Sequence, residues 1–105
     1  MEIELQNGEK LILEVSSLLL EYLEDYPGGV EQLEKDANED SKLMYVTNHL
    51  VYSMIASNYD KQLTYRQAVK LVKLDDIEKI IDFIIKNTPN LENKLINRET
   101  NIHRF

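Results

Sequence analysis

The stretch Leu43 to Tyr59, LMYVTNHLVYSMIASNY, runs for 17 residues without a formal charge in a chain that is 30% charged. Apolar side chains recur in it at helical spacing, as Leu43, Val46, Leu50 and Met54, and Met44, Val51 and Ile55 widen this face. The spacing predicts a central helix over about 42–58. Because the helix is apolar or aromatic nearly all round, we expect it to be buried nearly all round.

The first 15 residues predict a β-hairpin, since their apolar side chains alternate and all but Ile12 stand at odd positions. A two-residue loop at Asn7-Gly8 would pair odd positions with even ones. A three-residue loop over 6–8 pairs odd with odd and places Glu4 opposite Lys10, with Gly8 at the left-handed bulge position. We therefore predict the three-residue loop, with Ile12 on the outer face.

Four shorter helices surround the central one in this prediction. They span about 16–25, 30–36, 65–73 and 76–86. Ser16 or Ser17 is expected to cap the first, whose apolar stripe is Leu19, Leu20 and Leu23. Asp40 or Ser41 is expected to cap the central helix, and Thr64 with Gln67 fits a capping box. The predicted fold is mainly α, an N-terminal hairpin followed by a compact bundle of about five short helices.

The predicted globular domain covers residues 1–87. Residues 88–105, TPNLENKLINRETNIHRF, are polar and only weakly patterned. They carry three basic and two acidic side chains, whereas the body before them is strongly acidic. We expect them to form a flexible C-terminal tail.

Composition excludes several classes of function. The 105 residues include no cysteine, which rules out a disulfide scaffold, a cysteine-ligated metal and a thiol nucleophile. A net charge of −7 argues against a basic nucleic-acid-binding face. The first ten residues, MEIELQNGEK, lack the basic start and apolar run of a signal peptide, and the sequence has no apolar run long enough to span a membrane, so we expect a cytoplasmic protein. It also has no phosphate loop and no nucleophile elbow, and we predict neither catalytic activity nor a cofactor or metal.

An acidic segment is the first candidate for partner binding. Residues 21–40 contain eight acidic side chains and one lysine. Such a segment is either a solvated surface that keeps the domain soluble or a docking face for a basic partner. In the second interpretation, Glu31, Glu34 and Asp36 are the residues that make contact.

A stripe of aromatic side chains on the central helix is the second candidate. Tyr45, Tyr52 and Tyr59 recur every seven residues, and His49 lies between the first two. The rings could pack on the hairpin or the last helices, or they could form an interface, because tyrosine gives a large contact area at little entropic cost. His49 has no carboxylate or histidine at helical spacing, so a hydrogen-bonded, partly buried histidine is expected rather than a metal ligand.

The order of these features resembles the small tail assembly chaperones of long-tailed bacteriophages and prophages. The likeness lies in MEIELQNGEKLILEV (1–15), SLLLEYLEDYPGG (17–29) and LTYRQAVKLVKLDDIEKIIDFI (63–84). Together these segments cover most of residues 1–86, and they are patterns of residue class. Residues 88–105 match no pattern of this family.

The resemblance implies a mostly helical, non-enzymatic protein of the host cytoplasm that is absent from the mature virion. It would bind the helical tape-measure protein, shield its apolar face and help recruit tail-tube subunits. It also implies that a longer form can arise by translational frameshifting. The alternative is a small acidic inhibitor or antitoxin-like protein that masks a basic surface. The sequence leaves open whether the chain forms a homo-oligomer.

Overall fold

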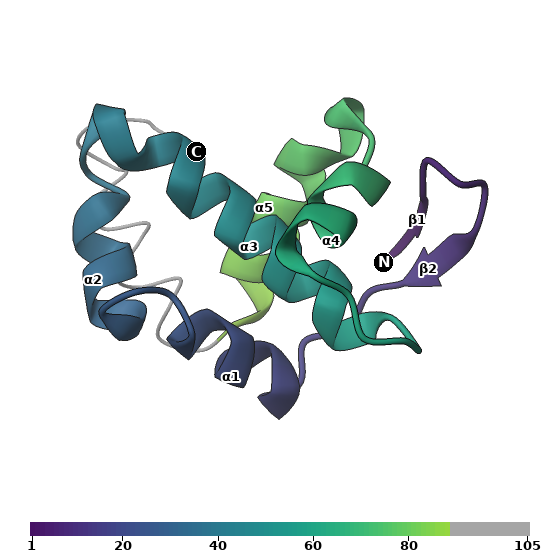
Figure 1. The fold of residues 1–105 in the computed structure, drawn as a ribbon, viewed down its shortest axis with the longest axis horizontal. Coiled ribbons are helices and arrows are strands. Elements are labelled where there is room, and N and C mark those ends of the chain that lie inside the picture. The colour runs from purple at the N-terminus through teal and green to yellow at the C-terminus, as the bar shows by residue number, and fades with distance from the viewer. Residues whose placement is uncertain (89–105) are drawn as a thin grey trace.

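A computed structural model describes residues 1–88, so the predicted tail over 88–105 lies outside the described part apart from its first residue. A two-stranded antiparallel hairpin precedes five α-helices (Figure 1). The elements are β1 (Glu2–Glu4), β2 (Lys10–Ile12), α1 (Ser17–Glu24), α2 (Gly29–Asp36), the 3-10 turn η1 (Asp40–Lys42), α3 (Leu43–Asn58), α4 (Tyr65–Leu71) and α5 (Leu74–Asn87). The fold is therefore mainly α with an N-terminal hairpin, as predicted.

The hairpin has the predicted register. Glu4 stands opposite Lys10, and the three-residue loop closes with a hydrogen bond from the Gly8 N–H to the Leu5 carbonyl of 3.0 Å. Gly8 has a φ of 87°, the left-handed region that glycine adopts most readily. Ile12 lies on the outer face and is 60% exposed. Alternation therefore fixes both the register and the buried face.

The hairpin is attached to the helices by polar contacts as well as by its apolar face. The Asn58 side chain at the end of α3 both accepts from the Glu14 N–H and donates to the Glu14 carbonyl, each at 3.1 Å. The Gln6 N–H donates to the Leu71 carbonyl at 2.7 Å, and Lys73 forms an ion pair with Glu4 at 2.8 Å. These contacts join the start of the chain to α3 and α4.

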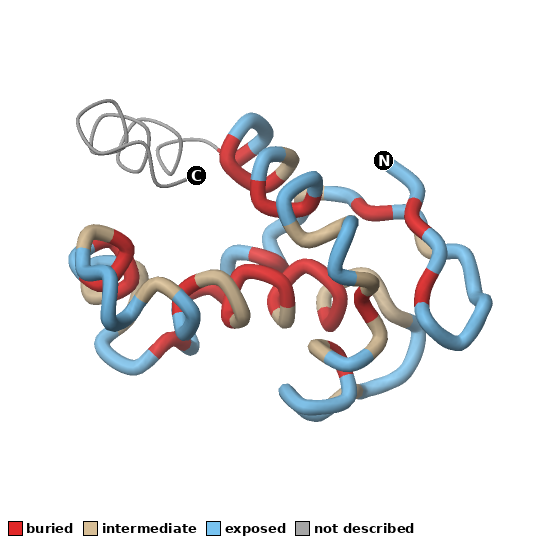
Figure 2. Tube along the Cα trace, turned by 90° about the horizontal axis from the view of Figure 1, so that it is seen from above, coloured by how far each residue is buried: buried red, intermediate tan, exposed pale blue. Residues whose placement is uncertain are grey.

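The central helix α3 is buried along most of its length (Figure 2). It packs against α1, α4 and α5, and its side chains Val46, Leu50, Met54 and Ile55 are fully buried in the core. Burial is not complete, however. Met44 and Tyr45 in the first turn are 69% and 63% exposed, which corrects the expectation of a helix buried nearly all round. Val46, the next residue, is fully buried, so the first turn of α3 exposes one side and buries the other.

The short helices follow the prediction to within a few residues, with two corrections. Leu20 is exposed, and Tyr22 takes its place as a half-buried side chain of α1. The predicted cap of α3 is wrong, because η1 occupies 40–42 and Lys42 holds the cap position without a side-chain hydrogen bond. Ser16 caps α1, and Thr64 with Gln67 forms the expected capping box. No helix within residues 1–88 is long and apolar enough to cross a lipid bilayer.

Candidate partner-binding groove

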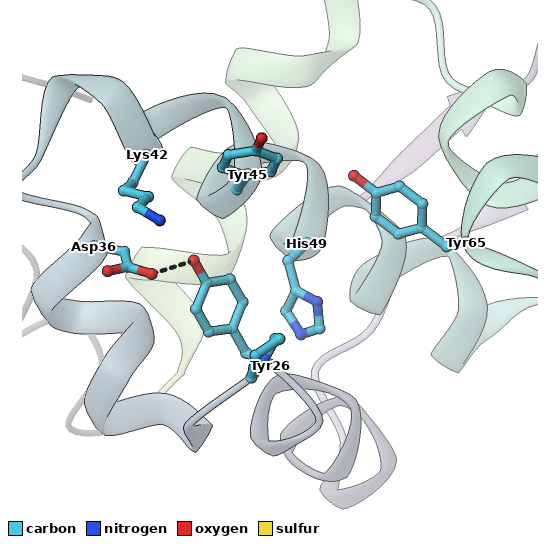
Figure 3. Close-up of a pocket in the computed structure, with 7 residues that line it drawn as sticks. Tyr26, Asp36, Lys42, Tyr45, His49 and Tyr65 are labelled. Carbon is cyan, nitrogen blue, oxygen red and sulfur yellow. Dashed lines mark hydrogen bonds between the residues drawn. The ribbon is translucent and has the colours of Figure 1, made fainter.

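A groove of about 510 Å³ opens at the N-terminal half of α3, between the end of α2 and the start of α4 (Figure 3). Its lining is mostly apolar and aromatic. The residues that shape it are Tyr26, Asp36, Lys42, Tyr45, His49 and Tyr65. They come from the loop after α1, from α2, η1, α3 and α4, so the groove exists only in the folded chain.

Tyr26 and Asp36 form one wall of this groove. The Tyr26 hydroxyl donates to Asp36 Oδ2 at 2.6 Å, and the Gln32 side-chain amide donates to Oδ1 at 2.8 Å. The Tyr26 hydrogen bond, with help from Gln32 and Lys42, holds the pKa of Asp36 below its ordinary value. Burial, together with the same hydrogen bond, raises the pKa of Tyr26. The pair is thus a phenol bound to a carboxylate near neutral pH, and it ties the loop after α1 to the end of α2.

His49 lies at the base of the groove and holds α1 in place. Its Nε2 lies 2.8 Å from the Tyr22 carbonyl oxygen. Because a carbonyl only accepts, the geometry assigns the ring proton to Nε2. Burial lowers the pKa of His49 and outweighs the Tyr22 and Leu23 carbonyls and the Asp25 charge, which raise it. His49 is hydrogen-bonded, as the sequence predicts, and is more deeply buried than the partly buried histidine expected there.

Tyr52 lies at the centre of a cluster of aromatic rings. Its ring lies 5.4 Å from Tyr22 in an edge-to-face arrangement, 5.6 Å from Tyr65 and 5.9 Å from His49, measured between centroids. His49 in turn meets Tyr26 at 5.1 Å. The rings therefore form a continuous wall from α1 across α3 to α4. Tyr52 belongs to this wall and is only half exposed at its surface.

Tyr45 forms the exposed rim of the groove. Its ring stands one helical turn before His49 on α3, and the Lys42 ammonium lies 5.9 Å from its centroid. Met44 beside it is also exposed. Of these two exposed side chains, Tyr45 lines the groove and Met44 does not.

The remaining predicted residues lie elsewhere. Tyr59 follows the end of α3 in extended conformation, and its hydroxyl donates to Glu9 of the hairpin at 2.8 Å, so it does not continue the stripe. Among the acidic candidates, Glu31 is exposed, whereas Glu34 and Asp36 are buried. Only Glu31 of the three is exposed, although Asp36 also lines the groove, which weakens the interpretation of these positions as one acidic face.

Sequence reasoning missed Tyr26, Lys42 and Tyr65, which line the groove, and Tyr22, which joins its aromatic wall. A signal for two of them existed, since Tyr22 and Tyr26 stand four residues apart at the end of a short helix. Tyr65 follows the correctly predicted cap Thr64, but nothing local to it indicates that α4 packs beside Tyr52. Its role depends on contacts between elements.

Within residues 1–88, no group of three or more acidic or histidine side chains is arranged to hold a metal ion. The groove can instead take up apolar side chains against its rings, while Asp36 and Lys42 offer polar contacts at its edge. No family model matches the chain, and no curated protein and no solved structure matches it either.

Proposed function

We propose that the protein is a non-enzymatic assembly chaperone that holds an amphipathic helix of its partner in the groove beside α3. The sequence resemblance to tail assembly chaperones makes the tape-measure protein of a long-tailed phage or prophage the proposed partner, with tail-tube subunits recruited afterwards. The observation that carries the proposal is the exposure of Tyr45 at the edge of an aromatic groove, on a helix whose other side fills the core.

Helix-in-groove binding supports this assignment physically. A partner helix presents apolar side chains at positions i, i+3, i+4 and i+7, and these need an apolar surface to enter. The groove offers the rings of Tyr26, Tyr45 and Tyr65. Tyrosine is enriched among residues that dominate binding energy. An acidic chain around the groove would keep the unloaded protein from aggregating.

Tyr45 gives the sharpest test because it is exposed. We expect Tyr45→Ala to weaken binding of the coexpressed tape-measure protein about ten-fold, the loss that follows when truncating an interface tyrosine costs about 1.4 kcal/mol. The thermal unfolding midpoint should stay at the wild-type value, because the ring contributes little to the core. Affinity is measured by titration calorimetry, and stability by circular dichroism.

Leu74→Ala is the matched control, since Leu74 is 83% exposed and lies outside the groove. It should leave binding unchanged. Equal losses in both variants would contradict a groove-centred interface. Tyr52→Ala is less suitable, because Tyr52 contacts Tyr22, His49 and Tyr65 and its loss would also destabilise the fold.

The genes on either side provide an independent test. The proposal predicts a tail-tube gene upstream and a very long coiled-coil gene downstream, with a slippery heptamer between. A neighbouring toxin, nuclease or repressor gene would instead favour the acidic inhibitor.

A further inference from the structure

A second groove, of about 430 Å³, lies between α1, α3 and the loop before α4. Its lining is mostly polar, in contrast to the first groove. Glu21, Tyr22, Asp25 and Tyr52 are the lining residues that matter for its chemistry. Glu21 and Asp25 stand four residues apart, so their side chains lie on the same face of α1.

The two grooves share one aromatic wall. Tyr52 lines the second groove, and its ring also contacts His49 and Tyr65, which line the first. A helix lying across this wall would therefore meet an apolar site and an acidic site. The ring of Tyr52 in the second groove lies 5.6 Å from that of Tyr65 in the first, measured between centroids, which is about the rise of one helical turn.

The two carboxylates of the second groove, Glu21 and Asp25, disfavour the helical state of α1. Like charges four residues apart repel each other, and acidic groups near a helix C-terminus oppose the helix dipole. Within residues 1–88 neither Glu21 nor Asp25 forms an ion pair. Asp25 and Tyr52 line the same groove, and burial, with the Asp25 charge as a smaller cause, raises the pKa of Tyr52. The stability of α1 therefore gives no reason for acidic side chains at positions 21 and 25.

We infer that the partner helix carries an arginine or lysine beside its apolar anchors, and that this basic side chain enters the second groove between Glu21, Asp25 and the ring of Tyr52. The inference rests on the proposed function and specifies the chemistry of its partner. Carboxylates form charge-assisted hydrogen bonds with such a cation, and an aromatic ring attracts it through its face. The other exposed carboxylates of segment 21–40 add a negative electrostatic potential that favours association with a positively charged helix.

A display library of helical peptides tests this chemistry without a known partner. Every peptide has a fixed leucine stripe at i, i+3, i+4 and i+7, and the flanking positions are randomised. The full chain is the bait. We expect the selected peptides to be enriched in arginine or lysine at one flank, and a selected arginine peptide to bind the double variant Glu21→Gln/Asp25→Asn about five-fold more weakly.

Glu78→Gln/Asp82→Asn is the matched control. These two exposed acids also stand four residues apart, on α5, and their loss changes the net charge equally. The control should bind the arginine peptide like the wild type, which separates a local site from general attraction. A further readout is stability, because Glu21→Gln/Asp25→Asn should keep or raise the unfolding midpoint, whereas removal of structural contacts would lower it.

The possible outcomes separate this inference from the proposed function. If selected peptides lose affinity for Tyr45→Ala but show no basic enrichment, the helix groove stands and the cation site is wrong. The cation site is also wrong if both acidic double variants weaken binding equally. If no peptide is selected by the wild type, the groove does not take up helices and both proposals are contradicted.

Discussion

Tyr26 joins the loop after α1 to α2 through a hydrogen bond to Asp36 at the wall of the first groove. Its hydroxyl donates a hydrogen bond to the buried carboxylate of Asp36. We therefore expect Tyr26→Phe to lower the free energy of unfolding by about 2 kcal/mol, a typical value for a hydrogen bond to a charged group. Urea denaturation measures the change. Tyr59→Phe serves as the comparison, because its hydroxyl bonds an exposed glutamate. A loss in Tyr59→Phe as large as in Tyr26→Phe would contradict the importance given to Asp36.

His49 should make stability depend on pH. Burial lowers its pKa below the ordinary 6.5, so the unfolded chain takes up a proton before the folded one does as the pH falls. Stability is therefore unaffected by this group above pH 6.5 and decreases below it, until the lowered pKa of the folded state is reached. The slope for one proton is at most about 1.4 kcal/mol per pH unit.

The test compares the free energy of unfolding at about pH 7.5 and about pH 5.5. His49→Gln should lose less stability across this interval than the wild type. His103→Gln is the matched control, since His103 is the only other histidine in the chain. An identical pH response in all three proteins would show that His49 titrates normally. The pKa of Asp36 is already lowered, so Asp36 does not titrate in this interval.

The turns of the chain allow a comparison between two glycines. Gly8 and Gly28 have φ values of 87° and 91°, which disfavour a side chain by about 1 kcal/mol or more. A Cβ on Gly8 would meet nothing within 4 Å, whereas one on Gly28 would lie 2.5 Å from Gln32 Cβ. Gly28→Ala should therefore cost clearly more stability than Gly8→Ala in thermal unfolding. Equal costs would mean that α2 shifts freely to relieve the contact.

Elements governed by local rules could be predicted from the sequence. Alternation determined the hairpin register, and Thr64 with Gln67 marked the start of α4. The predictions are wrong where contacts with a neighbouring element determine whether a side chain is buried or how a helix begins. Leu20 looks as apolar as Leu19 and Leu23, but α3 covers only the face on which the latter two lie. The start of α3 is predicted to within one residue, but its cap is wrong because η1 precedes the helix and Lys42 gives no side-chain cap.

Charge is divided unevenly over the whole molecule. Residues 1–60 carry 13 acidic and 3 basic side chains, whereas residues 61–88 carry 4 acidic and 6 basic ones. Repulsion within the acidic part opposes folding, and salt screens it. Raising NaCl from about 0.05 to about 0.3 M should therefore raise the thermal unfolding midpoint. A lower midpoint at high salt would indicate that ion pairs such as that of Lys73 with Glu4 outweigh the repulsion.

The candidate site could be predicted only in part, because it is a property of the whole chain. His49 and Tyr52 were found from their place on α3, and they do lie together. Their other neighbours, Tyr22, Tyr26 and Tyr65, come from segments far apart in sequence. Spacing along one helix cannot indicate which rings of other helices will meet it. Likewise, nothing in the acidic segment 21–40 indicates that Glu34 and Asp36 are buried while its other acidic side chains are exposed.

The tyrosines of the two grooves allow ligand binding to be detected by spectroscopy of the unlabelled protein. The chain has no tryptophan, and Tyr22, Tyr26, Tyr45, Tyr52 and Tyr65, five of its six tyrosines, line the two grooves. Intrinsic fluorescence and near-ultraviolet circular dichroism of the unlabelled chain therefore originate largely from the proposed binding surface. A tyrosine-free ligand that enters either groove should change these spectra directly, so binding could be followed without a dye or an engineered reporter.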